Sequence, residues 1–211
     1  AAIRRQVALC EAVYQGEATV EGMTGVLIHS PQEAQSVWEA GRVPVLVDES
    51  CACAAALQPD ILIDAIIAKR NLGTKRSLAP LTIALGRSGS AAPNSGIPGN
   101  IGGFSKERVL HAECAGVLHI VRDIGSLVEK DEVIAYIEKE SGEQVPVPAT
   151  LTGIIRGMIR EGFVVTQGFK IADIDPRQEE LANCFTISDK ARCIAGSVLE
   201  LVCRYAQEKQ K

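Results

Sequence analysis

The chain has 211 residues, of which 46% are apolar, 23% charged and 4% aromatic, and its formal net charge is −4. This balance is typical of a globular protein with aliphatic cores, and it argues against nucleic acid and anionic membrane surfaces as partners. No apolar run approaches the ~20 residues of a membrane span, and the seven cysteines lack disulfide-like spacing. We therefore expect a reduced, cytoplasmic protein.

The first predicted elements lie between residues 14 and 48. The polar, glycine-containing stretch 14–22 predicts a loop, and "TGVLIHS" (24–30) predicts a short buried strand. The sequence Ser-Pro-Gln-Glu (30–33) begins a helix, since it offers an N-cap serine, a proline at the first helical position and a glutamate at the capping-box position. "VPVLVD" (43–48) predicts a second strand.

Two further apolar runs, 59–68 and 78–86, each contain a predicted strand. Continuous apolar runs that alternate with helices favour a parallel sheet buried on both faces. The sequence therefore predicts an α/β domain over residues 1–88, followed by a Gly-rich connecting loop over 89–110.

Polar residues follow the strand within 59–68. In "DAIIAKRNLGT" (64–74) the candidate ligand-binding residues are Asp64, Lys69, Asn71, Gly73 and Thr74. Open α/β sheets bind ligands beyond the carboxyl ends of their strands. An ordinary charged loop is the alternative.

Cys51 and Cys53 are separated by one residue. Two thiolates at this spacing can bind a soft metal or form a redox pair, and they are the candidate catalytic residues. The alternative is that both are small side chains that pack an alanine-rich helix. No second cysteine pair completes a four-ligand zinc site, so we expect no metal.

Glycines and cations are concentrated between Ser90 and Leu110. Glycine allows backbone N–H groups to converge on an anion, and lysine and arginine supply charge suited to phosphate. A plain linker is the alternative. The candidate ligand-binding residues here are Asn94, Gly96, Gly99, Gly102, Gly103, Ser105, Lys106 and Arg108.

An internal repeat lies within residues 111–176. A shift of the sequence by 37 positions places "AGVLHIVRDIGSLVEKDEVIAYI" (115–137) on "TGIIRGMIREGFVVTQGFKIADI" (152–174) without a gap. Gly116 and Gly125 then meet Gly153 and Gly162. Neither copy can close its own core, so we expect two intertwined halves in one small β domain.

This repeat resembles the biotinyl/lipoyl-like barrel. Carrier members of that family hold a modified lysine in the hairpin between the halves. Lys139 lies three residues away from the position that the carrier spacing implies and lacks the expected neighbours. We therefore expect a docking or capping barrel that carries neither biotin nor lipoate.

The C-terminal region, 177–211, predicts a loop and then a helix with apolar residues at helical spacing. We expect the helix to pack on the α/β domain. Helix N-termini favour anions, so Ser188, Lys190 and Arg192 at its start join the candidate ligand-binding residues.

Several uncommon stretches resemble the YqeB-type family of accessory proteins of selenium-dependent molybdenum hydroxylases. They are "AAIRRQVALCEAVYQGEATVEG", "DAIIAKRNLGT", "APLTIALG", "AAPNSGIPGNIGGFSKERVL" and "CFTISDKARCIAG". The resemblance implies a Rossmann-like domain, then the barrel and a closing helix. Family members differ from this chain in a Gly-rich nucleotide-type turn near their start and in further residues after the position of Gly86.

The resemblance also implies a role in maturing these hydroxylases. The partners would be the hydroxylase apo-enzyme or its maturation proteins, with the possibility of a homo-oligomer. The ligand would be a phosphorylated molecule: a nucleotide, the dinucleotide form of molybdopterin, or selenophosphate. A non-catalytic docking module and a Rossmann-type redox or sugar-nucleotide enzyme are the alternatives, and the sequence contains no Ser-His-Asp set to decide for catalysis.

Overall fold

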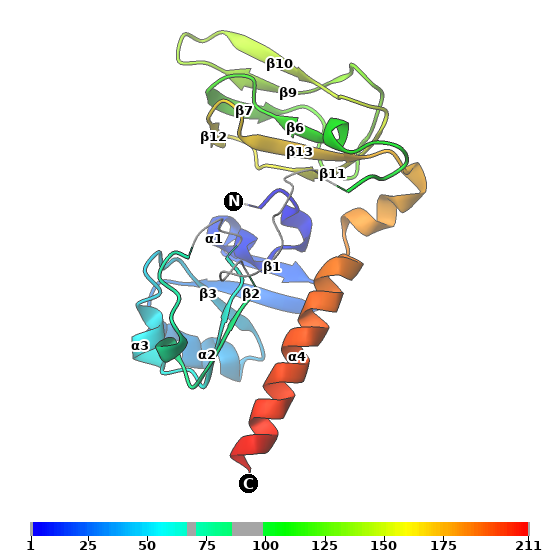
Figure 1. The fold of residues 1–211 in the computed structure, drawn as a ribbon. Helices are drawn as coiled ribbons and strands as arrows, with labels where there is room; N and C mark the ends of the chain where they lie inside the picture. The colour runs from blue at the N-terminus through cyan, green and yellow to red at the C-terminus, as the bar shows by residue number, and fades with distance from the viewer. Residues whose placement is uncertain (1, 67–70, 86–98, 211) are drawn as a thin grey trace. The chain divides into compact units, whose positions relative to one another are not determined.

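The computed structural model describes residues 2–66, 71–85 and 99–210 (Figure 1). The chain divides into two compact units, each built from segments that are not contiguous in sequence. The first unit contains residues 1–27, 36–45 and 96–187, and the second contains 28–35, 46–95 and 188–211.

The first unit opens with short helical turns and a small sheet. The turns are η1 (Arg5–Val7), η2 (Leu9–Glu11) and α1 (Ala12–Gln15), and the strands are β1 (Glu17–Val20), β2 (Met23–Ile28) and β3 (Val43–Leu46). The strand order is β1-β2-β3, and Figure 1 labels the three strands.

β1 and β2 form an antiparallel hairpin in which Val20 pairs with Met23. The two residues between them, Glu21 and Gly22, have φ values of 47° and 85°. Two positive φ values in a two-residue turn match the twist of paired strands. The stretch 14–22, predicted as a loop, thus contains a strand.

The repeat region contains eight strands. They are β6 (Val109–His111), β7 (Gly116–Ile120), β8 (Leu127–Val128), β9 (Val133–Glu138), β10 (Gln144–Pro148), β11 (Gly153–Met158), β12 (Val164–Val165) and β13 (Lys170–Asp175). η5 (Lys106–Arg108) precedes them and η6 (Gln178–Cys184) follows them. The strands form two four-stranded sheets, with orders β10-β9-β7-β12 and β6-β13-β11-β8.

The 37-residue repeat has a structural counterpart in these sheets. β7, β8 and β9 of the first copy correspond to β11, β12 and β13 of the second. Each copy places its short strand in the sheet of the other: β8 pairs with β11, and β12 pairs with β7. The two copies are therefore intertwined, and neither sheet is complete without both.

The repeated glycines occupy equivalent positions, as predicted. A Cβ on Gly116 would lie 2.3 Å from the carbonyl oxygen of Glu138, and one on Gly153 would lie 2.3 Å from that of Asp175. Gly125 and its counterpart Gly162 both have positive φ, 89° and 71°. The sequence repeats glycine because the same close approach and the same turn occur twice.

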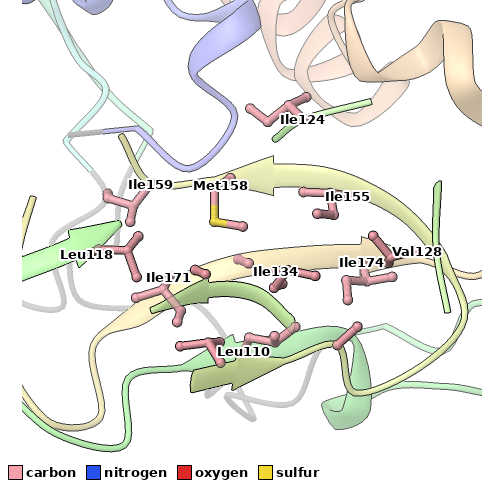
Figure 2. Close-up of a cluster of buried hydrophobic side chains, with 14 of the residues drawn as sticks. Leu110, Leu118, Ile124, Val128, Ile134, Ile155, Met158, Ile159, Ile171 and Ile174 are labelled. Carbon is pink, nitrogen blue, oxygen red and sulfur yellow. The ribbon is translucent and has the colours of Figure 1, made fainter. Parts of the chain in front are cut away.

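The largest apolar core lies between the repeat strands. Leu118, Ile134, Ile155 and Ile171 are fully buried, and Figure 2 shows side chains from both copies directed toward one another. Burial of aliphatic side chains of this size stabilises a fold by about 1.5–3 kcal/mol each. The packing between the copies therefore holds the two sheets together.

The second unit has a smaller regular framework. Its elements include η3 (Pro31–Glu33), α3 (Cys53–Leu57), β4 (Ile61–Asp64), η4 (Arg76–Leu78), β5 (Leu81–Ala84) and α4 (Asp189–Lys209), while α2 (Ala34–Glu39) runs from this unit into the first. β4 and β5 form a parallel pair. α4, the predicted C-terminal helix, has its last residue, Lys209, in an ion pair with Asp60.

The predicted Rossmann-like domain is wrong. Among the described residues before 88, the strands form the β1-β2-β3 sheet and a separate parallel pair, β4-β5. A parallel neighbour needs a long crossover, whereas the two-residue turn after β1 can join only antiparallel strands. Short apolar runs occur in parallel and in antiparallel strands, so the sequence pattern alone could not distinguish the two arrangements.

The predicted biotinyl/lipoyl-like closed barrel is also wrong, because the two sheets of the repeat are not closed. β10 and β12 are the edges of one sheet, and β6 and β8 are the edges of the other. β10 contains Pro146 and Pro148, which have no N–H to donate, as is usual at a sheet edge.

Candidate functional site

The loop after β4 brings together several of the predicted residues. Asp64 is the last residue of β4, and its carboxylate accepts hydrogen bonds from Ile66 N at 2.9 Å and from Thr74 Oγ1 at 2.5 Å. The bond from the Thr74 hydroxyl lowers the pKa of Asp64. Asp64 is therefore an ionised anchor for the loop rather than a free acid.

Asn71 closes the same loop. Its Oδ1 accepts from Gly73 N and Thr74 N, each at 2.8 Å, and its Nδ2 donates to the Thr74 carbonyl at 2.9 Å. Gly73 has a φ of 123°, which favours glycine. These polar groups bond one another, and Lys69 lies outside the described residues.

In the Gly-rich loop, the described part begins at Gly99, so Asn94 and Gly96 lie outside it. Gly102 and Gly103 form the tip of a tight turn, in which Ile101 and Phe104 exchange backbone hydrogen bonds of 2.8 and 3.0 Å.

Other N–H groups of the loop are also bonded within it. Gly103 N donates to Asn100 Oδ1 at 3.2 Å, and Ser105 N donates to Glu107 Oε2 at 3.0 Å. The described part of the loop is thus already shaped by its own hydrogen bonds.

Arg108 and Lys106 differ in exposure. Arg108 is only 6% exposed, its Nη1 donates to the Gly99 carbonyl at 3.2 Å, and its Nη2 lies 3.9 Å from Asp173 Oδ1. Lys106, two residues earlier, is exposed. Arg108 therefore fastens the loop to β13, while Lys106 presents its ammonium group to solvent.

Cys51 is exposed and Cys53 partly buried at the start of α3. Asp48 Oδ2 accepts from Cys53 N at 2.7 Å, and Asp48 Oδ1 accepts from Ser50 N at 3.1 Å. Burial, together with the Asp48 carboxylate, raises the pKa of Cys53 to about 11. The Cys53 thiol is therefore protonated at neutral pH and a weak nucleophile.

The start of α4 carries its own cap. Ser188 Oγ accepts from Ala191 N at 3.4 Å, and the first helical residue is Asp189. Lys190 and Arg192 are exposed on the first turn. The hydroxyl of Ser188 thus accepts from one of the first N–H groups of α4, and the carboxylate of Asp189 lies on the same first turn.

A buried ion cluster at the end of β13 was not predicted from the sequence. Asp175 is 1% exposed, and it accepts from Arg156 Nη1 at 2.7 Å and from Arg177 Nη2 at 2.8 Å. Burial acts against ionisation, but the bonds from Arg177 and Arg156 lower the pKa of Asp175 to about 2. The signal available was an acid and a base at 175 and 177, a spacing too common to assign.

A second unpredicted feature is a small pocket, open to solvent, between the N-terminal turns and β1. Arg5, Gln6, Glu11, Gln15, Ala18 and Thr19 are among the residues that line it. Glu11 is 4% exposed. A lone glutamate in the apolar stretch "ALCEAVY" was the available signal.

Neither a metal-binding cluster nor a membrane-spanning helix is present in residues 2–66, 71–85 and 99–210. No group of three or more His, Cys, Asp or Glu in these ranges is arranged to hold a metal ion. No helix within them is both long and apolar enough to span a membrane.

The sequence is similar to YqeB from Escherichia coli strain K12, whose curated name is "Uncharacterized protein YqeB". The two are 42% identical over 223 aligned residues, which cover 94% of this chain and 40% of that protein. The alignment is longer than the chain, so the relative carries residues in this region that the chain lacks. The match confirms the predicted resemblance to YqeB-type proteins, and the chain spans less than half of this relative.

No protein-family model matches the sequence. Among solved structures, a succinylglutamate desuccinylase/aspartoacylase from Rhodobacter sphaeroides is 18% identical over 33% of this chain and 22% of its own, with a TM-score of 0.31. The apo form of EutE (DoeB), an ectoine utilization protein from Ruegeria pomeroyi, is 17% identical over 66% and 41%, also with a TM-score of 0.31. Similarity at this level supports no functional argument.

Proposed function

We propose that the chain is part of a cytoplasmic maturation factor for selenium-dependent molybdenum hydroxylases. The proposal is supported by the 42% identity to YqeB over 94% of the chain, together with the motifs that resemble the accessory family. Its partners are the hydroxylase apo-enzyme or the other proteins that mature it.

We further propose that the Gly-rich loop contributes to binding a phosphorylated ligand. Nucleotides, the dinucleotide form of molybdopterin and selenophosphate share a phosphate group, for which an exposed lysine is a suitable counter-ion. Lys106 stands next to the tight glycine turn and is exposed. Arg108 supports the loop from inside, because its guanidinium bonds the Gly99 carbonyl.

The maturation role is tested in a deletion strain. We expect the purified hydroxylase to keep its molybdenum and pterin, to lack labile selenium and to be inactive, while selenocysteine proteins stay unaffected. Elemental analysis measures selenium and molybdenum in one sample. A selenium-to-molybdenum ratio equal to that of the parent strain would refute the maturation role. Loss of both elements would mean that the protein acts earlier, at insertion of the molybdenum cofactor.

The ligand is tested by thermal shift at low salt with ATP, molybdopterin cytosine dinucleotide and selenophosphate as separate probes. Lys106→Ala should abolish the stabilisation by the active probe. Lys130→Ala is the matched control, because Lys130 is also exposed and its substitution removes the same charge. Arg108 is unsuitable for this test, since its loss would disturb the loop itself. Equal ligand-induced increases in Tm in the two variants would show that the loop is a linker and does not bind the ligand.

A non-catalytic docking role is the second candidate, and the state of Cys53 favours it. A selenium carrier needs a thiolate, whereas the pKa of Cys53 is raised to about 11. A Rossmann-type enzyme requires the predicted Rossmann-like sheet, and the described strands do not form that sheet. In the alternative to docking, the thiol of Cys51 or Cys53 would carry the selenium. If a Cys51→Ser, Cys53→Ser double variant restores selenium in the deletion strain, this thiol-carrier mechanism is excluded; failure to restore selenium would favour it over docking.

A further inference from the structure

The pocket beside β1 contains a carboxylate without a matching charge. Glu11 belongs to η2 and lines the pocket, and 96% of its surface is removed from solvent. Its Oε1 is buried and accepts no hydrogen bond from the described residues. A buried carboxylate without donors costs free energy, and a ligand that supplied them would recover it.

Arg5 also lines the pocket, but its hydrogen bonds and ion pair are made to groups other than Glu11. Its Nη2 forms an ion pair with Asp123, and its Nε donates to the Met158 carbonyl at 3.2 Å. No ion pair between Glu11 and a described basic residue lies within 4 Å, so the negative charge of Glu11 remains available to a ligand.

The other polar groups of the pocket are neutral. Gln6 and Gln15 offer amide oxygens, and Thr19 offers a hydroxyl whose oxygen lies 2.9 Å from Thr24 Oγ1. One carboxylate with neutral oxygen acceptors suits a monovalent cation that carries N–H donors. Divalent metals are bound by several carboxylate and carbonyl oxygens in fixed geometry, which this lining does not supply.

We propose that this pocket binds the primary ammonium group of a small organic molecule, with Glu11 as its counter-ion. The ammonium group donates to the Glu11 carboxylate and to the amide and hydroxyl oxygens of the rim. The inference is independent of the phosphate-binding loop and of the maturation role, because it uses none of their residues.

The test is an NMR titration of the whole chain with ethylammonium chloride. Amide shifts should change at residues 5–20 and should saturate. Potassium chloride at equal ionic strength should leave those amides unchanged, and tetramethylammonium, which has charge but no N–H donor, should bind more weakly. Equal effects of all three salts, or shifts confined to other regions, would overturn the proposal.

Two variants make the test specific. Glu11→Gln should weaken ethylammonium binding by about tenfold or more, since a charged hydrogen bond becomes a neutral one. Without ligand it should raise Tm, because an unpaired buried charge is removed. Ala18→Leu should reduce binding by filling the pocket while it leaves Glu11 in place.

Glu113→Gln is the matched control, because Glu113 is exposed on a loop and its substitution changes the net charge equally. It should bind ethylammonium as the parent chain does. Undiminished binding in Glu11→Gln, or a lower Tm of its free form, would show that the carboxylate serves the fold and not a ligand. If Glu11→Gln fails to fold, undiminished binding in Ala18→Leu still overturns the proposal.

Discussion

The repeat strands of the first unit and the second unit are stabilised in different ways. Between β6 and β13, long-range packing dominates, and side chains such as Ile134 and Ile171 are completely buried. In the second unit, the described buried apolar residues are Ile28, Ala34, Ala79 and Ile83.

Local hydrogen bonds take the place of a large core in the second unit. Asp48 bonds Cys53 N, Asp64 bonds Thr74, and Asn71 bonds its own loop. α4 contributes no buried residue and leaves Ile194 and Leu199 exposed. We infer that single substitutions lower the free energy of unfolding most when they lie between the repeat sheets. The second unit should tolerate substitution better, while its loops hold side chains in specific hydrogen bonds.

The largest effect is expected at Gly153. In Gly153→Ala the new Cβ would lie 2.3 Å from the Asp175 carbonyl oxygen, so a backbone must shift, and we expect a loss of about 3 kcal/mol or more. Gly116→Ala should behave in the same way. Gly196→Ala in α4 is the control: nothing lies within 4 Å, and alanine should stabilise the helix by up to about 1 kcal/mol. Urea unfolding measures the free energy of unfolding of the three variants. Comparable losses of stability in Gly153→Ala and Gly196→Ala would show that the two regions do not differ in this way.

The next effect compares two isoleucines. Ile154→Ala opens a cavity at a fully buried position of β11 and should cost about 2–5 kcal/mol. Ile63→Ala removes the same atoms from β4, where the side chain is 46% exposed, and should cost less than about 1 kcal/mol. Hydrogen exchange read by mass spectrometry reports each region separately. A cost for Ile63→Ala as large as that for Ile154→Ala would mean that the second unit depends equally on packing.

Acid stability should depend on the ion cluster of the repeat region. The pKa of Asp175 falls from 3.8 to about 2 on folding, so its contribution is complete above about pH 4 and is lost as the pH falls toward 2. The shift corresponds to roughly 2 kcal/mol. Asp175→Asn should therefore be less stable than the parent at pH 7, and the difference should shrink between pH 4 and pH 2. Asp131→Asn, at an exposed turn, is the control, and a difference independent of pH would contradict the assignment.

Part of the fold could be predicted because it repeats. The 37-residue shift exposed glycines whose roles are local, namely a close approach at Gly153 and a positive φ at Gly162. The intertwining of the two copies was predicted from the repeat, but the sequence did not identify β8 and β12 as the exchanged strands, since pairing partners are set by packing far along the chain. The polar stretch 14–22 predicts a loop, and the antiparallel pair β1-β2 differs from this prediction because only Glu21 and Gly22 form the turn.

The candidate site shows the same limit. Residue type made Asn71 and Gly73 candidate ligand-binding residues, but it did not show that their polar groups bond one another within the loop. Arg108 was chosen for its charge, but its burial depends on β13, which lies more than sixty residues later. Glu11 was missed because a lone acid in an apolar stretch is a weak signal, since tertiary packing decides whether the acid is buried.

The smallest effect concerns thiol reactivity in the second unit. Burial raises the pKa of Cys53 first, and the Asp48 carboxylate adds to it. Asp48→Asn keeps an oxygen acceptor for Cys53 N but removes the charge, so in a Cys51→Ser background the alkylation of Cys53 by iodoacetamide at alkaline pH should become a few-fold faster. Asp60→Asn, which removes the same charge beside Lys209, should leave the rate unchanged. If Asp48→Asn also leaves the rate unchanged, burial alone sets the pKa, and packing would govern chemistry in the second unit as it governs stability between the repeat sheets.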